Sequence, residues 1–583
     1  MATLRRLAEK VAVKAEPGLT ATQLMLTNYD LKPVEPARRR WGAWNFVAFW
    51  IANAFNINTW MISGTMITGG LSWWQAWLSV WIGYFIAAAI ACMTGRIGST
   101  YHIGFPVVNR ASFGIWGSLW PVFNRAAMAC IWYGVQSYIG GNCVYLMIRS
   151  IWLNWDRTKI PNTFSPTSGT TTADYVSFFL FWLVSLVALW FPVQSLRHLF
   201  TFKSYFVPAA GVAFFIWTLV RAGGAGPIIH QKASLSGSAL GWEIIKGIMS
   251  SISNFAALII NDPDFTRFAR KPSNAFLPQF VTIPVAFALT SFIGIFVSSA
   301  SQDIYGVPIW NPLDMLDNFI NDGGSGRRFG VFVIATAFSI AQLGTNLTAN
   351  SVSAGSDMSA LLPRFINIRR GSYICAAVGL AMCPYNLLTS SNQFTTYLSS
   401  YSVFLSSIAG PMIADYYIVR RGYLEVRELY HSRSQGPYYH QLGFHWRAYA
   451  AYFAGILINV VGFAGSVGRT VPIGATYIYN VSYFSGFIVS FGMYCLLSYF
   501  WPVAACSPSG QWMEIGDAIF DDADPQLAYE NSSDAGTPTD PVYGDEKSSA
   551  KDADEEVDDK RRGGSGSGYR KDEPFGGDTE LPV

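Results

Sequence analysis

The sequence predicts an all-α membrane protein with about twelve transmembrane helices, and three observations favour this fold class. Hydrophobic residues make up 51% of the 583 residues and charged residues only 13%, whereas a soluble globular domain carries about 25% charged residues. Apolar stretches near the roughly 20 residues that a helix needs to cross a bilayer recur along most of the chain. Polar sequence gathers instead at the two ends of the chain. The middle of the chain is therefore solvated by lipid.

The apolar stretches set the order of the elements along the chain. A polar arm at 1–40 precedes the transmembrane domain at 41–504, in which 174–192 (DYVSFFLFWLVSLVALWFP) is the clearest span. Residues 505–583 are rich in Asp, Glu, Gly and Ser and cannot bury enough apolar area to offset the entropy of ordering, so we expect a disordered acidic tail. The twelve predicted helices lie near 44–68, 72–93, 121–149, 174–192, 204–221, 242–262, 279–300, 329–350, 366–385, 393–418, 448–468 and 482–504.

The same composition excludes several classes of function. A net charge of +3 from 40 basic and 37 acidic residues leaves no surplus for binding nucleic acid. The seven Cys residues show no metal-binding spacing, and the six His residues lie in or near loops without forming a catalytic cluster. No pore-forming repeat marks a channel. We therefore expect a lipid-embedded transporter rather than an enzyme, with no cofactor, no metal ion and no nucleic acid as a partner.

Basic residues concentrate in alternate loops, which predicts the orientation of the chain. Two groups run against this pattern, namely Arg149 with Arg157 and Lys159, and Arg327 with Arg328. The overall bias still predicts that both termini lie in the cytoplasm. The loops without Lys or Arg are 69–72, 383–392 and 470–482. The basic residues of the opposite loops and arm are Arg38, Arg39, Arg40, Arg96, Arg110, Arg197, Lys203, Arg267, Arg270, Lys271, Arg364, Arg369, Arg370, Arg420, Arg421, Arg427 and Arg433.

Polar residues interrupt two of the predicted helices. Asn53, Asn56 and Asn58 lie in the middle of the first, and the sixth contains the run Ser250-Ser-Ile-Ser253-Asn254-Phe255, followed by Asn261-Asp-Pro-Asp-Phe265. Asn side chains favour non-helical turns, and unwound backbone in a membrane is stable only where it lines protein or a cavity. Interruptions at corresponding helices of two five-helix halves favour an inverted-repeat transporter with a site at the bilayer midplane. The alternative is that these groups only bridge neighbouring helices.

An indole and an amide share one face of the third predicted helix. Trp132 and Gln136 are four residues apart, so their side chains point the same way. The indole offers a flat apolar surface, and the amide offers a donor and an acceptor. Together they suit a small planar heterocycle with a urea or imide edge, although ordinary helix packing is the alternative.

Two more groups are candidates for the same site. Asn346 and Asn350 share a face in the last turns of the eighth predicted helix, where polar side chains are costly unless they face a polar cavity. Phe394, Leu398 and Tyr401 form a stripe with spacing i, i+4, i+7 on the tenth. Such a stripe is also typical of a packing surface.

Many segments between Asn28 and Pro502 together resemble the fungal uracil/allantoin/uridine permease branch of the nucleobase–cation symporter 1 family. The resemblance implies a leucine-transporter-like fold, in which helices 1–5 and 6–10 form inverted repeats and two further helices follow. The segments are NYDLKPVEPARRRWGAWNFVAFW, SWWQAW, STYHIGFPVVNRASFGIWGSLWPVFNRAAMA, IWYGVQSYIGG, INDPDFTRFA and PYNLLTSSNQFTTYLSSYSVFLSSIAGPMIADYYIVRRGY.

The resemblance also implies roles for residues at matching positions. Trp132 would stack on the substrate ring, while Gln136 and Asn350 would hydrogen-bond its polar edges. Phe255 falls where a second stacking aromatic is expected, with Asn254 beside it. The remaining implied positions are Asn58 for substrate contact and Phe394, Leu398 and Tyr401 for gating.

The positions that hold sodium in sodium-coupled members of this family look vestigial here. They correspond to Ala54, Ile57, Ala341, Gly344 and Thr345. Sodium needs several oxygen ligands, and a glycine has no side-chain oxygen, so the resemblance implies proton coupling. The candidate proton carriers are Asp262, Asp264 and Asp415, for which a satisfied ion pair or helix cap is the alternative.

The expected function is therefore a plasma-membrane secondary transporter that imports a small heterocycle together with a proton. Uracil is the first expected substrate, ahead of allantoin, uridine and uric acid, and a leucine-transporter-like carrier for another small solute is the more distant alternative. The tail lysines Lys547, Lys551, Lys560 and Lys571 would suit a ubiquitin-ligase adaptor as a partner. A solvated tail without a partner is the alternative.

Overall fold

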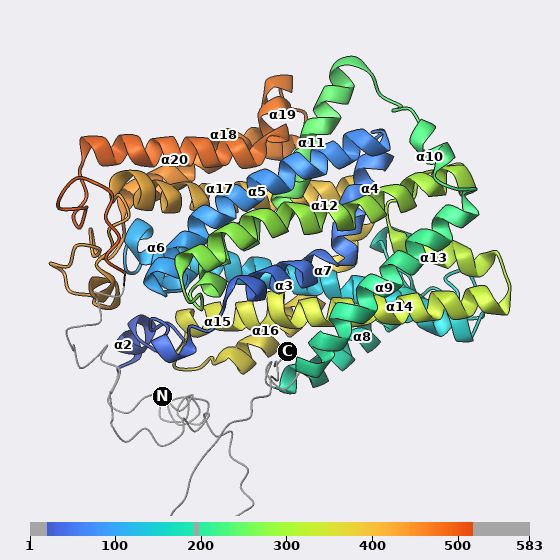
Figure 1. The fold of residues 1–583 in the computed structure, drawn as a ribbon, viewed down its shortest axis with the longest axis horizontal. Coiled ribbons are helices and arrows are strands. Elements are labelled where there is room, and N and C mark those ends of the chain that lie inside the picture. The colour runs from blue at the N-terminus through green and yellow to red at the C-terminus, as the bar shows by residue number, and fades with distance from the viewer. Residues whose placement is uncertain (1–19, 29, 192–196, 517–583) are drawn as a thin grey trace, which may run out of the picture. The chain divides into compact units, whose positions relative to one another are not determined.

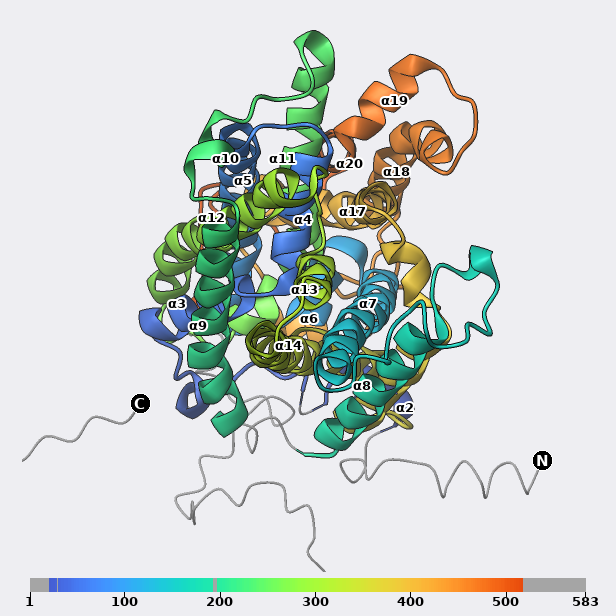
Figure 2. The same ribbon diagram turned by 90° about the vertical axis from the view of Figure 1, so that its right-hand side faces the viewer.

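The computed structural model describes residues 20–28, 30–191 and 197–516, and these residues are mainly helical. Each of the twelve predicted spans coincides with a helix (Figures 1 and 2). The helices that cover them are α3 (Ala43–Ala54) with α4 (Ile57–Thr68), α5 (Trp73–Tyr101), α7 (Leu119–Ile151), α8 (Thr172–Trp190), α9 (Arg197–Arg221), α11 (Gly237–Thr266), α12 (Pro272–Tyr305), α14 (Ser325–Thr345), α16 (Ile368–Ala381), α17 (Ser391–Ala414), α18 (Trp446–Ser466) and α20 (Ser482–Phe500).

Shorter elements lie at the two ends of this bundle. The end that carries the N-terminal arm from Thr20 to Gly42, α6 (Phe105–Phe113) and residues 502–516 is called the arm end below. The opposite end carries α13 (Pro312–Asn321) and is called the α13 end. The other short helices are α2 (Ala21–Leu26), α10 (Gly226–His230) and α19 (Ile473–Asn480). The predicted acidic tail lies outside the described residues from 517 onward.

The predicted interruption of the first transmembrane helix is confirmed. Helix α3 ends at Ala54, and α4 begins at Ile57 after a turn at Phe55 and Asn56. Asn56 caps α4, because its side-chain oxygen accepts a hydrogen bond from the backbone N–H of Asn58 at 3.0 Å. A short polar side chain thus satisfies a backbone donor that the break would otherwise leave unpaired.

The predicted interruption of the sixth helix is wrong. Helix α11 runs without a break from Gly237 to Thr266. Ser251 bonds back to the carbonyl of Gly247 at 3.1 Å within the same helix, so its hydroxyl is satisfied without unwinding the backbone. The second departure from α-helical geometry occurs instead in η4 (Asn346–Ser351), a π-helical turn. Such turns are rare and frequently lie at functional sites.

The eighth crossing is longer than the sequence predicts. Helix α14 continues through η4 into α15 (Val352–Leu361), so that Asn346 and Asn350 lie inside a long helix rather than near its end. Nine helices in the described part of the chain, this long one among them, have the length and hydropathy of a membrane span. The interrupted first crossing, α7 and α16 are not among the nine.

The helices pack as two groups with α17, α18 and α20 beside them. The first group is α3, α4, α5, α11 and α12, in which α5 lies along α11 and α12. The second group is α7, α8, α14, α15 and α16, in which α7 lies along the other four. Residues Ile57–Ile67 of α4 are all buried, so this half of the interrupted crossing lies in the interior of the bundle, as Figure 2 shows.

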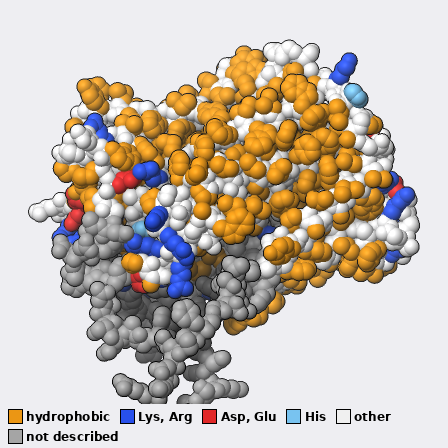
Figure 3. All heavy atoms as spheres, viewed as in Figure 1, with side chains coloured by type: hydrophobic (Ala, Val, Ile, Leu, Met, Phe, Trp, Pro, Cys, Tyr) orange, Lys and Arg blue, Asp and Glu red, His pale blue; other side chains and the backbone are white. Residues whose placement is uncertain are grey.

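Large apolar side chains cover the outside of the bundle. Trp74, Leu78 and Phe85 of α5, and Leu277 and Leu289 of α12, are 48% to 63% exposed, whereas an aqueous surface disfavours such a continuous apolar area. In the face shown in Figure 3, hydrophobic side chains fill the middle and charged side chains gather toward the two ends. This pattern fits a bundle whose middle is surrounded by lipid.

Small residues let the helices of the second group approach closely. A β-carbon on Gly134 of α7 would lie 2.6 Å from the carbonyl oxygen of Gly379 on α16. In the same way, a β-carbon on Gly379 would lie 3.0 Å from the backbone nitrogen of Gly134. Close approach at glycine is a common way for helices to associate in membranes, where no hydrophobic force draws one helix to another.

We expect Gly134→Val to destabilise the protein by about 1–3 kcal/mol, because the added atoms overpack a contact made by backbone. Thermal unfolding of the purified protein in detergent measures the effect. Gly492→Ala in α20 is the matched control, since a β-carbon there would meet no atom within 4 Å. Equal melting temperatures for the two variants would contradict the close packing of α7 on α16.

Candidate functional site

A cavity of about 90 Å³ lies where the interrupted crossing, α7, α11 and η4 meet. Its lining is mostly uncharged, with side-chain amides and one indole. Such an apolar wall with a few convergent polar groups is typical of a small-molecule site. The lining residues are Asn53, Asn56, Asn58, Thr59, Arg125, Ala129, Trp132, Gln136, Asn254, Ala257, Leu258, Asn261, Phe287, Thr345, Ala349, Asn350 and Ser353.

The structure brings together five of the six residues that the sequence analysis proposes for substrate binding. Trp132, Gln136, Asn350, Asn254 and Asn58 all line the cavity. They come from four separate parts of the chain, namely the interrupted crossing, α7, α11 and η4. The predicted grouping of these five around one cavity is therefore what the structure shows.

Phe255 lies elsewhere in this conformation. Its ring packs against Trp50, Tyr84 and Phe287, with ring centres 5.1, 6.0 and 5.2 Å away, and the side chain is fully buried. Neighbouring residues of a helix point about 100° apart, so Asn254 can face the cavity while Phe255 turns from it. The aromatic ring that lines the cavity on this side belongs to Phe287 of α12.

A chain of hydrogen bonds connects one wall of the cavity to the core. Asn58 Nδ2 donates to Asn254 Oδ1 at 2.8 Å, and Asn254 Nδ2 donates to the hydroxyl of Tyr84 at 3.0 Å. Asn58 Oδ1 accepts no hydrogen bond within the described residues. Sequence analysis missed Tyr84, although a tyrosine hydroxyl in the middle of an apolar span needs a buried polar partner.

A second chain of hydrogen bonds supports the opposite wall. Asn346 Nδ2 donates to the backbone carbonyl of Tyr133 at 3.1 Å and to the hydroxyl of Ser137 at 2.8 Å, both on α7. Asn350 Nδ2 donates to Asn346 Oδ1 at 2.9 Å. Gln136, between these groups on α7, has a buried side-chain oxygen without a partner in the described part of the chain.

The gating candidates lie on α17, beside the cavity rather than in its lining. Tyr401 places its ring 6.1 Å from that of Trp132, and its hydroxyl donates to the backbone carbonyl of Ser253 at 2.6 Å. Phe394 packs against Trp310, with ring centres 5.6 Å apart, and Leu398 is fully buried.

A second cavity, of about 750 Å³, lies on another side of α17. It is bordered by α4, α11, α17, α18 and α19. Thr395, Thr396 and Ser399 of α17 line it, whereas Tyr397 and Tyr401 contact Trp132. Helix α17 therefore has one face toward the wide cavity and another toward the indole of the small one.

Comparisons with known proteins agree on one family. The model of a permease family for cytosine/purines, uracil, thiamine and allantoin matches residues 33–486. The chain belongs to the nucleobase–cation symporter 1 family of permeases. Its members are transporters and not enzymes, so the small cavity lies in a secondary transporter.

Three permeases of Saccharomyces cerevisiae place the chain in the fungal uracil/allantoin/uridine branch of this family. The allantoin permease is 46% identical and the match covers 84% of this chain and 78% of the relative. The uridine permease is 45% identical, with 82% and 75% covered. The uracil permease is 44% identical, with 85% and 79% covered.

A solved structure of Mhp1 in an inward-facing conformation has the same fold. It matches with a TM-score of 0.65 at 21% identity, over 83% of this chain and 96% of that chain. The predicted leucine-transporter-like architecture of the symporter family is thus confirmed, although the two interruptions that the sequence suggested are not both present.

A lysine lies at the positions that the sequence analysis identifies as a vestigial cation site of this symporter family. Lys203 Nζ donates to Thr345 Oγ1 at 3.0 Å, and the lysine is 7% exposed. A β-carbon on Gly344 would lie 2.9 Å from Lys203 Cδ, so the glycine leaves room for this side chain. The remaining vestigial positions, Ala54, Ile57 and Ala341, are also buried.

The placement of Lys203 in a loop is a wrong prediction. The fifth crossing begins at Arg197 rather than near 204, so Lys203 lies inside α9. An ammonium group that is buried in a membrane helix is costly, and side chains of this kind mark functional positions by default. The signal that could have identified it is a single lysine next to the start of an apolar span.

An ion cluster lies at the edge of the cavity toward the arm end. Arg125 of α7 contacts Asp357 of α15 at 2.6 Å and Asp264 of α11 at 3.3 Å, and donates to Ser353 Oγ at 2.7 Å. Asp264 also caps α6 by accepting from the backbone N–H of Phe105 at 2.9 Å. Sequence analysis missed Arg125, although an arginine inside a predicted span is itself a signal for a site.

The other two candidate carboxylates have partners within the protein. Asp262 accepts from Gln279 Nε2 at 2.8 Å. Asp415, in η6 (Asp415–Val419), accepts from Arg420 at 2.8 Å and from the hydroxyl of Tyr494 at 2.7 Å. For Asp415 the structure therefore shows the satisfied ion pair that was the alternative to a proton carrier, whereas Asp264 shares its cation with Asp357.

We expect Arg125→Ala to lower the unfolding free energy by about 3–5 kcal/mol, because it leaves the buried carboxylate of Asp357 and the partly buried carboxylate of Asp264 without a cation. The triple variant Arg125→Ala, Asp264→Asn, Asp357→Asn has no buried charge at this place and should recover most of that loss. Thermal unfolding of the purified proteins checks both. A triple variant that is no more stable than Arg125→Ala would show that charge pairing is not what the cluster contributes.

Proposed function

We propose that this permease imports a small neutral heterocycle across the plasma membrane by proton symport, with uracil as the first substrate and allantoin as the second. Uridine and uric acid are the further candidates in this branch. The observation that carries the proposal is the cavity between α7, α11 and η4, whose lining includes the indole of Trp132 and the amides of Gln136, Asn350, Asn254 and Asn58. Uncharged hydrogen-bonding groups suit a ligand that has carbonyl and N–H groups but no charge.

The shape and chemistry of this cavity favour a single planar ring. The indole of Trp132 offers a stacking surface, which contributes about 0.5–1.5 kcal/mol beyond burial. Gln136 and Asn58 each have a side-chain oxygen without a protein partner among the described residues. The three yeast relatives are each named for one ligand, namely uridine, uracil or allantoin. Their identities to this chain differ by only two percentage points, so sequence identity does not rank the three ligands.

Helix α17 is proposed as the gate. Its Tyr401 lies beside the indole of Trp132 and holds α17 against the backbone of α11, while Thr395 and Ser399 of the same helix line the wide cavity. Phe394 and Leu398 are buried on this helix and are the other proposed gate residues. Movement of α17 away from Trp132 would connect the two cavities. The wide cavity would then be the entrance from the outside.

We expect Gln136→Ala to weaken saturable uracil uptake at least tenfold, because the ring loses a hydrogen-bonding partner in a water-poor site, at a cost of about 1–3 kcal/mol. Uptake of radiolabelled uracil in cells that lack their own permeases measures the effect, with allantoin, uridine, uric acid and cytosine as competitors. Thr348→Ala is the control, since its hydroxyl bonds back to Gly344 and does not line the cavity. Undiminished uptake by Gln136→Ala at normal surface expression would contradict the assignment.

Two charged groups support a proton as the coupling ion. The ammonium group of Lys203 lies beside Thr345, where a sodium ion would need oxygen ligands, so a fixed cation takes up the place of a mobile one. The cluster at the arm end has one guanidinium, Arg125, and two carboxylates, Asp264 and Asp357. With both carboxylates ionised its net charge is −1, and a proton makes this buried group neutral, which lowers the cost of burial. We infer that the cluster binds the coupled proton.

We expect uracil uptake to be independent of sodium and to rise as the external pH falls, and we expect Asp357→Asn to remove most of this pH dependence. The substitution makes the cluster neutral without a proton, so transport no longer needs to carry one. Uptake measured across external pH, with sodium replaced by choline, tests both parts. Asp314→Asn at the α13 end is the control, because that carboxylate pairs with Arg157 away from the cavity. A pH profile of Asp357→Asn that matches the wild type would exclude this cluster.

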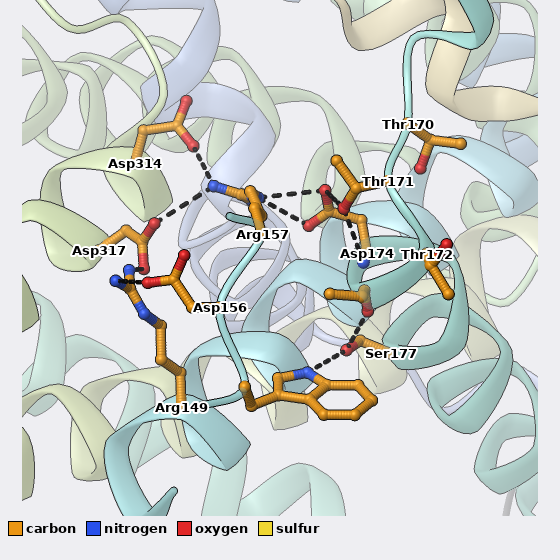
Figure 4. A network of polar contacts seen from close by, with 12 residues as sticks. Arg149, Asp156, Arg157, Thr170, Thr171, Thr172, Asp174, Ser177, Asp314 and Asp317 are labelled. Atoms are coloured by element: carbon orange, nitrogen blue, oxygen red, sulfur yellow. Dashed lines mark hydrogen bonds and ion pairs between the residues drawn. The ribbon is translucent and has the colours of Figure 1, made fainter. Parts of the chain in front are cut away.

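The charge distribution supports a cytoplasmic position for the arm end. The two groups of basic residues that run against the predicted orientation are neutralised or bonded at the α13 end. Arg157 pairs with Asp174 at 2.9 Å and with Asp317 at 3.3 Å, and Arg149 pairs with Asp156 and Asp317 (Figure 4).

Arg327 and Arg328 are bonded differently. Arg327 donates to the backbone carbonyl of Asp322, and Arg328 donates to those of Ser150 and Ile151. Neutral carbonyls leave both charges in place, so these two arginines remain exceptions at the α13 end, whereas the arm end carries the larger basic bias that marks the cytoplasmic side. The tail lysines that we propose as targets of a ubiquitin-ligase adaptor, Lys547, Lys551, Lys560 and Lys571, lie outside the described residues.

A further inference from the structure

The side-chain amide of Asn346 can take only one orientation. Its nitrogen lies 3.1 Å from the backbone carbonyl of Tyr133, which can accept a hydrogen bond but cannot donate one. The second N–H of the same nitrogen reaches the hydroxyl of Ser137 at 2.8 Å. Exchange of the oxygen and nitrogen would set two acceptors against each other inside the membrane, where an unpaired polar group is costly.

The orientation of Asn346 fixes that of Asn350. Asn346 Oδ1 can only accept, and it lies 2.9 Å from Asn350 Nδ2. The carbonyl oxygen of Asn350 must therefore point away from Asn346. Asn350 lines the cavity, and its Oδ1 accepts no hydrogen bond from the described residues. It is an acceptor without a donor in a cavity that suits a small ligand.

The other amides of the cavity are not held in this way. Gln136 has no hydrogen-bonding partner among the described side chains, so its oxygen and nitrogen can exchange places. The chain from Asn58 through Asn254 ends at the hydroxyl of Tyr84, and a hydroxyl can donate or accept. These amides can adapt to a donor or to an acceptor on the ligand, whereas Asn350 cannot.

We propose that Asn346 is a positioning residue that locks Asn350 as a hydrogen-bond acceptor, so that every good substrate must present a ring N–H to it. The inference rests on the proposed function. Uridine carries its sugar on N1, so the ring N–H that it shares with uracil is the imide N–H between two carbonyl groups. Hydantoin rings, as in allantoin, have the same group. Cytosine has the shape of uracil but presents an acceptor at this nitrogen, and it is the ligand that a locked acceptor rejects.

Competition between uracil and cytosine tests the lock. In wild-type cells, cytosine should compete with radiolabelled uracil at least tenfold more weakly than unlabelled uracil does, which corresponds to about 1.4 kcal/mol for one unpaired acceptor. Asn346→Ala frees the amide of Asn350 to turn and should reduce this ratio several-fold, as measured at matched surface expression. Thr348→Ala, in the same π-helical turn but outside the cavity, should leave the ratio at its wild-type value.

Two further variants separate positioning from a structural role. Asn350→Ala should abolish the discrimination, and Asn346→Ala added to it should change nothing more, because Asn346 acts through Asn350. Asn346→Ser replaces Asn346→Ala if the latter does not reach the membrane, since a hydroxyl that both donates and accepts also releases the lock. An unchanged ratio in a variant that transports uracil would overturn the inference, as would additive effects in the double variant.

The inference and the proposed function fail in different ways. If the wild type takes up allantoin or uridine rather than uracil, the labelled substrate is changed and cytosine remains the competitor, so the ratio is still measured. Wild-type cells that take up none of the three contradict the proposed function, and the inference falls with it. Wild-type uptake with cytosine as effective as uracil contradicts the inference alone.

Discussion

Lipid offers no hydrogen bonds, and this constraint determines how the interior of the permease is built. Every polar group that the cavity needs must be satisfied by the protein or by the substrate. Asn56 shows how this works at the interrupted crossing. Its side-chain oxygen caps α4 and also accepts from Gln342 of α14 at 3.2 Å, so the same group ends one helix and holds another beside it. One side chain therefore stabilises the helix break, lines the cavity and holds α4 beside α14.

The parts of the fold that could be predicted are those that depend on local sequence. Each crossing is an apolar stretch of sufficient length, so hydropathy is enough to place it. The break at Asn56 is local too, because the residue that favours the turn also supplies the cap. Helix α11 shows the limit of this reasoning. Its serines look like an interruption in the sequence, but Ser251 bonds within its own helix, and only the structure shows where the hydroxyl points.

The candidate site was predictable where one helix face carries the signal and not where distant segments meet. Trp132 and Gln136 share a face, so spacing alone places them together. Arg125 depends on Asp264 and Asp357, which lie on two other helices far along the chain, and no pattern in the sequence connects the three. Lys203 was misplaced because hydropathy treats a charge next to an apolar span as its boundary. The lysine is tolerated inside α9 because Thr345 and the space at Gly344 receive it.

The polar bonds also divide the bundle into two bodies with the site between them. The chain Asn58–Asn254–Tyr84 lies within the group of α4, α5 and α11, and the bonds of Asn346 lie within the group of α14 and α7. Few of the hydrogen bonds described above cross from one group to the other.

Those that do cross lie around the cavity, namely the contact of Gln342 with Asn56 and the contact of Arg125 with Asp264. A ligand held by Trp132 and Asn350 on one side and Asn58 on the other would add to these few links. Protonation of the Arg125 cluster would change one of them. In the proposed mechanism, substrate and proton would thus act on the same weakly bonded boundary, and a transporter that exposes its site alternately to the two sides of a membrane needs its two bodies to separate at such a boundary.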